Sequence, residues 1–199
     1  MKKNLSKFAE KTMFLLFLIS FLFGYGQGTK FSRNSIKTGI GIGYNMGVKE
    51  EGLGALSTIG YERGYGKKER LRMDVSLLLG GFSSKAISDS RDNYYRTTSL
   101  NINANYDLVK YNSTSLFIYS GGFVNFSRGM LGSGFSESTG QAYDSELFSY
   151  FYFGANLGCG LRINPRSNRC AFEIKPINFQ IRNNEFVTTY MIFGVDIKI

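Results

Sequence analysis

Residues 100–108 read LNINANYDL, an uninterrupted alternation of apolar and polar side chains. The apolar positions are Leu100, Ile102, Ala104, Tyr106 and Leu108, and the polar positions between them are Asn101, Asn103, Asn105 and Asp107. An alternation with a period of two residues is typical of a β-strand whose two faces meet different environments. This stretch therefore predicts a strand, with apolar side chains on one face and hydrogen-bonding side chains on the other.

The same pattern extends in both directions and predicts eight strands in the 199 residues. The segment at 115–127 is rich in aromatic residues, so its facing cannot be assigned from the sequence. The alternation that begins at Phe172 is interrupted by Pro176. We expect the strands at about 38–48, 55–62, 71–80, 100–108, 115–127, 151–163, 172–175 and 187–199.

The predicted connections alternate in length, which favours a membrane barrel. If the N-terminus is periplasmic, the short connections at 64–70, 110–114 and 164–168 face the periplasm, whereas 82–93 and 128–147 are longer external loops. Short periplasmic turns and longer external loops are typical of outer-membrane barrels. The external connections at 49–54 and 182–185 are short, so this asymmetry depends on two loops. We predict an all-β fold, an eight-stranded antiparallel up-and-down transmembrane β-barrel.

The composition of the polar face distinguishes a membrane barrel from a soluble one. A soluble periplasmic ligand-binding barrel would direct its apolar face inward and would cover its exterior with charged residues. Here the polar face is mainly Gly, Asn, Ser, Thr and Tyr, which fit a lumen that side chains fill. Its charges have both signs, so we expect ion pairs inside the barrel. The charged residues of the predicted polar face are Glu62, Arg72, Asp74, Asp107, Arg162, Glu173, Lys175, Asp196 and Lys198.

The first residues predict export. A basic region with four Lys residues precedes an apolar run at 13–23, and Gly24 and Gly26 are small residues suited to signal-peptidase cleavage. The apolar run is shorter than the roughly 20 residues that a spanning helix needs. The alternatives are a retained anchor or a buried helix. We predict a signal peptide at 1–26 and an outer-membrane β-barrel domain at 27–199.

The net charge of +9 does not indicate a nucleic-acid partner. Four Lys and one Glu in residues 1–26 contribute +3, which leaves +6 for the predicted mature chain. This surplus contains no basic run interleaved with aromatic residues, the pattern that nucleic-acid binding favours. We therefore predict no nucleic-acid partner.

Three short motifs carry a resemblance to a known family. They are the run 60–63 (GYER), the run 119–122 (YSGG) and the glycine-containing segment 153–160. Together with a final strand that ends in the apolar Ile199, these segments resemble the small outer-membrane barrel proteins of the Bacteroidota, the PorT-like barrel domain. The resemblance covers nearly the whole predicted mature chain. It implies the fold and the location, because members of that family differ in function.

The residues that usually perform chemistry are sparse. The chain contains no His, so the usual general base near neutral pH is missing. Glu62 and Asp74 form a conceivable carboxylate pair on neighbouring strands, but Arg72 and Arg63 nearby favour a structural salt bridge. We predict no enzyme activity, no catalytic residues, no cofactor and no metal site, and the sequence identifies no binding residues.

Three further patterns have structural interpretations. The glycines at positions 39, 41 and 43 are followed by no helix, so they suit a narrow lumen better than a dinucleotide loop. Asn101, Asn103, Asn105 and Asp107 are too far apart along one strand to converge on a cation, and we expect them to form hydrogen bonds in the lumen. Two lipid-facing thiols are expected at Cys159 and Cys170, with a disulfide as the alternative.

Function is expected at the external loops, where a rigid scaffold usually carries it. Aromatic and apolar residues occur there among Gly and Ser, which suits contact with a protein or a glycan, although the pattern slightly favours the alternative of a mobile solvated loop with aromatic residues at its rim. They are Tyr94, Tyr95, Met130, Leu131, Phe135 and Tyr143.

We predict an integral protein of the cell outer membrane with a structural or interaction role, including that of a subunit of an envelope complex. Outer-membrane lipid and other envelope proteins, bound through the external loops, are the expected partners. The alternatives are a membrane-embedded lipid-binding or enzymatic barrel, with carboxylates at the outer rim, and the soluble barrel described above. The sequence leaves the oligomeric state open.

Overall fold

The computed structural model describes residues 33–46, 50–66, 70–83, 93–111, 113–135, 142–165, 169–182 and 187–199. For residues 93, 132–135 and 142–145 the backbone alone is described. The predicted signal peptide, 1–26, lies outside the described residues, as do the tips of the predicted loops at 84–92 and 136–141.

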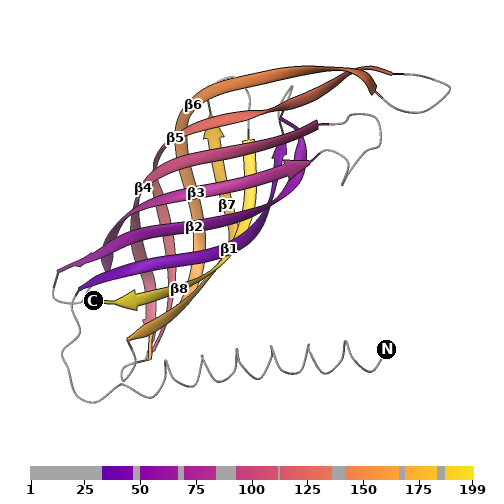
Figure 1. Cartoon of the computed structure of the whole chain (residues 1–199). Helices are drawn as coiled ribbons and strands as arrows, with labels where there is room; N and C mark the ends of the chain where they lie inside the picture. The colour runs from indigo at the N-terminus through magenta and orange to yellow at the C-terminus, as the bar shows by residue number, and fades with distance from the viewer. Residues whose placement is uncertain are drawn as a thin grey trace, which may run out of the picture.

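The described residues form eight strands in one closed antiparallel barrel (Figure 1). Each strand pairs with its neighbours in the sequence, and β1 pairs with β8 to close the sheet. The predicted fold class is therefore confirmed. The strands are β1 (Asn34–Met46), β2 (Gly52–Tyr65), β3 (Leu71–Ser83), β4 (Asn93–Tyr111), β5 (Thr114–Phe135), β6 (Ala142–Ile163), β7 (Cys170–Arg182) and β8 (Val187–Lys198).

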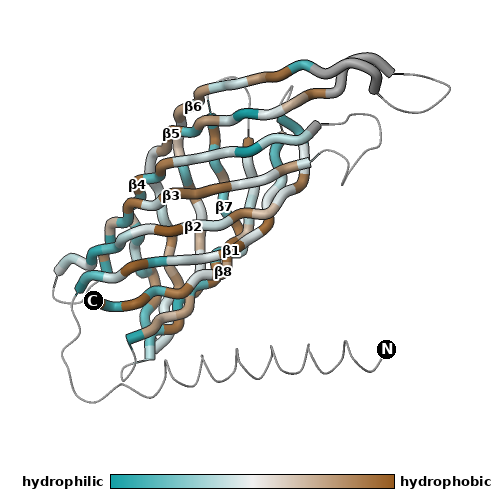
Figure 2. Tube along the Cα trace, viewed as in Figure 1, coloured by the Kyte–Doolittle hydropathy of each residue, from teal (hydrophilic) through white to brown (hydrophobic). Residues whose placement is uncertain are grey.

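The apolar face of the sheet points outward. On β4, Ile102 is 52% exposed, whereas the neighbouring Asn101 and Asn103 are 4% and 6% exposed in the lumen. Figure 2 shows this alternation of hydrophobic and hydrophilic residues along the strands. An exterior of Ile, Leu, Val and Phe is stable in hydrocarbon and not in water, and a closed barrel satisfies the backbone hydrogen bonds there. The arrangement excludes the soluble barrel, which needs its apolar face inside.

The facing of β5, which the sequence left open, is now defined. Phe117, Tyr119 and Phe123 point into the lumen and are buried, whereas Ile118 and Val124 between them are exposed on the outer face. Between Phe117 and Val124 the aromatic side chains therefore lie in the lumen and the aliphatic ones face outward, although Phe126 further along also faces outward. The two faces have nearly equal hydrophobicity, so no pattern of polarity distinguishes them.

The prediction of a long external loop at 128–147 is wrong for most of its length. β5 continues to Phe135 and β6 begins at Ala142, and the two strands stay paired up to these residues. Within the described residues, β4 follows β5 only to Leu131 and β7 follows β6 only from Gly154, so the β5–β6 hairpin extends past the described parts of its neighbours (Figure 1). Gly and Ser suggested a loop here, but pairing in a sheet overrides such weak local preferences.

Pro176 distorts β7 without ending it. The strand continues from Cys170 to Arg182, and its pairing with β8 shifts register between Lys175 and Asn178. Pro176 and Ile177 are consecutive and both exposed, so the strict alternation of faces is broken at this point. Proline cannot donate a ladder hydrogen bond, and a bulge accommodates it.

Both cysteines are free thiols, and the strand register separates them. Cys159 of β6 lies opposite Ile177 in the middle of β7. Cys170 is the first residue of β7 and lies opposite Ile197 of β8. Cys159 is half-buried, but Cys170 is buried, so its predicted exposure to lipid is wrong. Within the described part of the chain, no helix is long and apolar enough to span a bilayer.

Candidate functional regions in the lumen and at the outer rim

Buried ion pairs fill the part of the lumen nearest the start of β1 and the end of β8. Glu62 of β2 is the centre, with an ion pair to Lys37 of β1 at 2.9 Å and another to Arg72 of β3 at 3.3 Å. Arg162 of β6 also pairs with Glu62 and holds Asp196 of β8 at 2.8 Å. Each of these side chains is at most 9% exposed. The predicted salt-bridge network is confirmed, and it joins strands all around the barrel.

The role predicted for Arg63 is wrong, although that of Arg72 is correct. Arg63 points outward from β2 and is exposed, with its guanidinium 5.8 Å from the centre of the Tyr65 ring. Glu62 and Asp74 lie directly opposite each other on β2 and β3, as expected for neighbours on the luminal face. Alternation accounts for the difference, because residues 62 and 63 must face opposite sides of the sheet.

Amide side chains occupy the middle of the lumen. Asp74 accepts hydrogen bonds from Asn103 at 3.1 Å and from Asn105 at 2.8 Å. Asn101 accepts from both Asn156 of β6 and Gln180 of β7 at 3.0 Å. The predicted role of the β4 asparagines as hydrogen-bonding groups in the lumen is confirmed. These bonds satisfy buried polar groups that would otherwise destabilise the barrel.

Three luminal carboxylates lie close enough to share a cation. Oxygen atoms of Glu62, Glu173 and Asp196 all lie within 4.8 Å of one another. However, Lys37 pairs with both glutamates, and Arg162 pairs with Glu62 and Asp196. Lys175 lies 3.8 Å from Glu173, so three side-chain cations compensate these three negative charges. The arrangement is explained by ion pairing within the wall and needs no metal.

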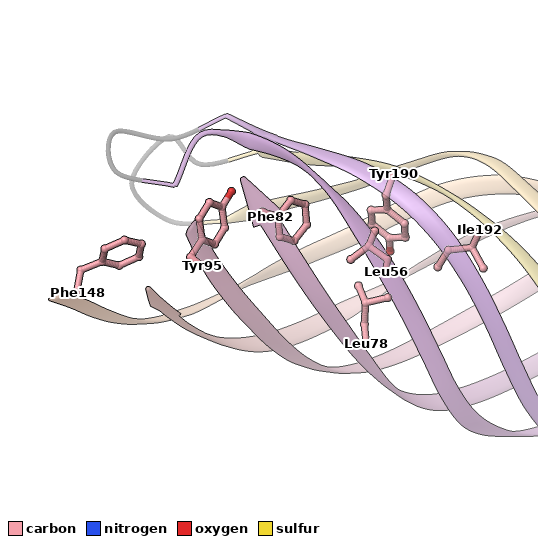
Figure 3. Close-up of a cluster of buried hydrophobic side chains, with 7 residues drawn as sticks. All are labelled: Leu56, Leu78, Phe82, Tyr95, Phe148, Tyr190 and Ile192. Atoms are coloured by element: carbon pink, nitrogen blue, oxygen red, sulfur yellow. The ribbon is translucent and has the colours of Figure 1, made fainter. Parts of the chain in front are cut away.

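An apolar cluster fills the lumen toward the end from which the β5–β6 hairpin projects, and the sequence pattern did not predict it. Phe82 and Tyr95 form its centre, with stacked rings whose centroids are 5.2 Å apart (Figure 3). The signal was present at Leu78, which lies between two other leucines and breaks the alternation of β3. The cluster comprises Leu56, Leu78, Phe82, Tyr95, Phe148, Tyr190 and Ile192. The lumen is thus obstructed by apolar side chains above and by ion pairs below.

The lumen contains small cavities rather than a channel. One cavity of about 40 Å³ lies between the ion pairs and the apolar cluster, lined among others by Lys37, Tyr119 and Ile192. Another of about 50 Å³ lies at the mouth near Asn34 and Lys198, beside Arg72 and Asp107. Such volumes hold a few water molecules. Sites for small organic ligands are several times larger.

A polar cap covers the apolar cluster at the rim. Glu50, between β1 and β2, is 1% exposed and accepts a hydrogen bond from the Tyr152 hydroxyl. The Tyr95 hydroxyl donates to the backbone oxygen of Glu50 at 2.8 Å and accepts from Asn45 at 2.7 Å. The Arg182 guanidinium lies 4.9 Å from the Tyr152 ring. Glu50 is a carboxylate at this rim, as an enzymatic barrel would need if this end faces outside, but its burial keeps it from a substrate.

The β5–β6 hairpin presents aromatic residues on both sides. Phe148, Tyr150 and Tyr152 follow one another on the luminal side, with ring centroids 5.7 and 5.9 Å apart. Leu147 and Phe151 lie on the other side and are 75% and 64% exposed. The sequence analysis expected functional residues in this region, on an external loop at 128–147. The structure places them on a paired hairpin that extends beyond the barrel.

Comparison with known proteins identifies the fold. No family model matches the chain, and no curated protein matches its sequence. Among solved structures, it is similar to the attachment invasion locus protein Ail of Yersinia pestis, at 14% identity and a TM-score of 0.55 over 83% of this chain and 97% of Ail. It is also similar to Neisserial surface protein A, at 14% identity and a TM-score of 0.57 over 86% of this chain and 100% of that protein.

These similarities show the fold alone. They agree with the predicted class and location, because the barrel has the architecture of small outer-membrane proteins. The finer resemblance to the PorT-like barrels of the Bacteroidota has no matching family model. By its fold, the chain is a small eight-stranded outer-membrane-type β-barrel.

Proposed function

We propose that this chain is an integral protein of the outer membrane that acts in structure or interaction, through the projecting β5–β6 hairpin. The observation that carries the proposal is the combination of a filled lumen with a hairpin that extends past the rest of the barrel. Side chains obstruct the lumen at two levels, which argues against a diffusion pore. The hairpin is the part of the described chain that offers backbone and apolar side chains to another molecule.

The edge of β6 supports a protein partner. β6 pairs with β7 only from Gly154 onward, so residues 142–153 have no ladder partner on that side within the described chain. An unpaired strand edge is a template for pairing with a strand from another protein. Leu147 and Phe151 add exposed apolar contacts along the same segment. A partner that adds one extended strand would satisfy the backbone and cover these side chains.

Non-enzymatic function is supported by the state of the buried carboxylates. Glu62 and Glu173 are in ion pairs, Asp74 accepts amide hydrogen bonds, and Glu50 accepts from Tyr152. A general base needs a lone pair that a substrate can reach. The chain also contains no His. These features support a role in binding rather than in catalysis.

The family and the export signal are part of the proposal. The run GYER at 60–63, which lies within β2, supports a relationship to the PorT-like barrels of the Bacteroidota. The basic and apolar residues at 1–26 support cleavage of a signal peptide. Sequencing of the N-terminus of the protein purified from membranes should give Gln27 as its first residue. An N-terminus at Met1 would contradict cleavage.

The membrane location is tested by fractionation of expressing cells. We expect the protein in the sarkosyl-resistant membrane fraction, and we expect faster migration on a gel before boiling than after it. A closed barrel that resists detergent gives this heat-modifiable shift. Recovery in the soluble periplasmic fraction without such a shift would contradict the proposal.

The interaction role is tested by photo-cross-linking in intact cells. A photoreactive amino acid replaces Leu147 at the hairpin or Tyr111 at the opposite end of the barrel, and both natural side chains are 75% exposed. We expect a discrete protein adduct from position 147 and none of the same mass from position 111. Absence of any discrete adduct from position 147, with the barrel still heat-modifiable, would contradict the interaction role.

A further inference from the structure

Two arginines lie side by side on the outer surface of the barrel. Arg96 of β4 and Arg128 of β5 are direct partners in the ladder, and both are exposed. The Cβ atoms of directly opposed residues are about 5 Å apart, and like charges at that separation destabilise a sheet. The two positive charges therefore lower the stability of the sheet, and a neutral residue at either position would avoid this cost.

No acidic group of the described chain compensates this pair. Neither guanidinium forms an ion pair there, and Arg96 donates one long hydrogen bond, 3.4 Å, to the Tyr94 hydroxyl. The flanking ladder positions are Gly81 on β3 and Ser149 on β6, which are both uncharged. The space above Gly81 is open, with no atom within 4 Å of the position of a Cβ. The pair is thus accessible, and no counter-charge lies beside it among the described side chains.

The position of the pair corresponds to the upper edge of the lipid-facing band. Along the outer face of β4, Tyr106 lies ten residues from Arg96, toward the termini. Ten residues at about 3.3 Å each, on strands tilted by about 40°, rise about 25 Å, which is the height of the apolar band of outer-membrane barrels. Between these two positions Leu100 and Ile102 are exposed apolar residues. If Tyr106 lies at one interface, Arg96 and Arg128 lie at the other.

We propose that Arg96 and Arg128 together bind a phosphate group of an outer-leaflet lipid, a phosphorylated glycolipid whose acyl chains lie against the adjacent apolar surface. The proposal depends on the outer-membrane function proposed above, with the β5–β6 hairpin on the outer side. Each guanidinium can donate two hydrogen bonds to phosphate oxygens in a fixed fork. One phosphate between them removes the repulsion between the two arginines. Phe126 and Phe151, exposed on the side toward the membrane, provide the surface for acyl chains.

The experiment uses the full-length barrel in phosphate-free maltoside micelles. The ligand is lipid A with its phosphates, compared with chemically dephosphorylated lipid A and with inorganic phosphate. The variants are Arg96→Gln, Arg128→Gln and the double variant. The control is Arg63→Gln, an exposed arginine at the other end of the barrel whose guanidinium stacks over Tyr65. Native mass spectrometry measures lipid A retained by each protein, and the heat-modifiable shift measures the temperature of unfolding.

The wild type and Arg63→Gln should bind lipid A equally and should unfold at a higher temperature when it is bound. Each single variant should bind about tenfold more weakly or worse, because a charge-assisted hydrogen bond is lost. Dephosphorylated lipid A should bind the wild type as weakly as lipid A binds the double variant. Inorganic phosphate should not raise the unfolding temperature, because it lacks the acyl chains.

Equal binding of lipid A by the double variant and the wild type would overturn the proposal, as would equal binding of the dephosphorylated lipid. A rise in unfolding temperature with inorganic phosphate would assign the site to a free anion instead. If the barrel remains heat-modifiable but binds lipid A and dephosphorylated lipid A equally, the phosphate site is refuted and the outer-membrane function is not. A protein without any heat-modifiable shift would refute both.

Discussion

Lys37 on β1 and Glu173 on β7 form an ion pair of 2.8 Å that passes over the intervening strand β8. The pair therefore links the two sides of the seam at which the barrel closes. Lys37 also pairs with Glu62 on β2, so one ammonium group holds carboxylates from both directions around the wall. The closing strands are joined by luminal charges in addition to their backbone ladder.

We predict that Lys37→Met destabilises the barrel by about 3–5 kcal/mol, because it leaves Glu62 and Glu173 buried without their shared cation. The matched control is Arg169→Gln, an exposed arginine just before β7, which should change the stability by at most about 0.5 kcal/mol. Urea unfolding in micelles, followed by circular dichroism, measures both, since the chain has no Trp for fluorescence. Equal stability of the two variants would contradict a structural role for the ion pair.

Gly41 is predicted to be intolerant of a side chain. A Cβ built there overlaps the carbonyl oxygen of Met191 on β8, and backbone cannot move aside without separating β1 from β8. Gly41→Ala should destabilise the barrel by about 1–3 kcal/mol or prevent closure. Gly81→Ala, at an open position, should leave stability unchanged or slightly raised. The fraction of heat-modifiable protein after refolding distinguishes the two.

Phe82→Ala is predicted to cost about 3–5 kcal/mol, because Phe82 is 1% exposed and its removal leaves a cavity in the apolar cluster. Phe153→Ala is the control, since Phe153 is 58% exposed on the outer face and fluid lipid can refill the space it leaves. The comparison requires urea unfolding of both variants in the same micelles. A larger loss for Phe153→Ala would mean that lipid contact outweighs packing in the lumen.

The orientation of the barrel in the membrane is also testable. In a background without Cys159 and Cys170, Leu147→Cys should react with a membrane-impermeant maleimide added to intact cells. Tyr111→Cys, at the opposite end, should react only after the outer membrane is permeabilised. Both natural residues are 75% exposed, so exposure does not bias the comparison. The reverse labelling pattern would place the hairpin in the periplasm.

The sequence predicted the strands in which polar side chains all face the lumen and apolar side chains all face outward. On β4, four consecutive apolar–polar alternations fixed both the strand and its facing, and Asn101, Asn103 and Asn105 lie in the lumen as expected. The facing of β5 was not predictable because Phe117 inside and Ile118 outside are both apolar. Polarity distinguishes two faces only when their side chains differ in polarity, and here an apolar ring lies in the charged part of the lumen, 5.1 Å from the Arg72 guanidinium.

The regions of interest were harder to predict, because they depend on pairing between distant strands. The extension of β5 to Phe135 is a property of its ladder with β6, and local Gly and Ser residues give no sign of it. The cluster around Phe82 and Tyr95 combines residues from several strands. Likewise, Arg96 and Arg128 are 32 positions apart (128 − 96), and their adjacency follows from register alone. Register was the quantity that the sequence could not supply.

The pairing of β1 with β8 has a consequence for how the protein folds. Ser35 pairs with Lys198, 163 positions later (198 − 35), so the seam cannot form until the last strand has been synthesised. Contacts between such distant residues slow folding, because loop closure must precede the gain from pairing. Until then, β1 exposes a strand edge that could pair with another chain. Assembly of this barrel therefore requires that its first strand be kept from premature partners, and the rate of seam closure sets the time during which aggregation competes.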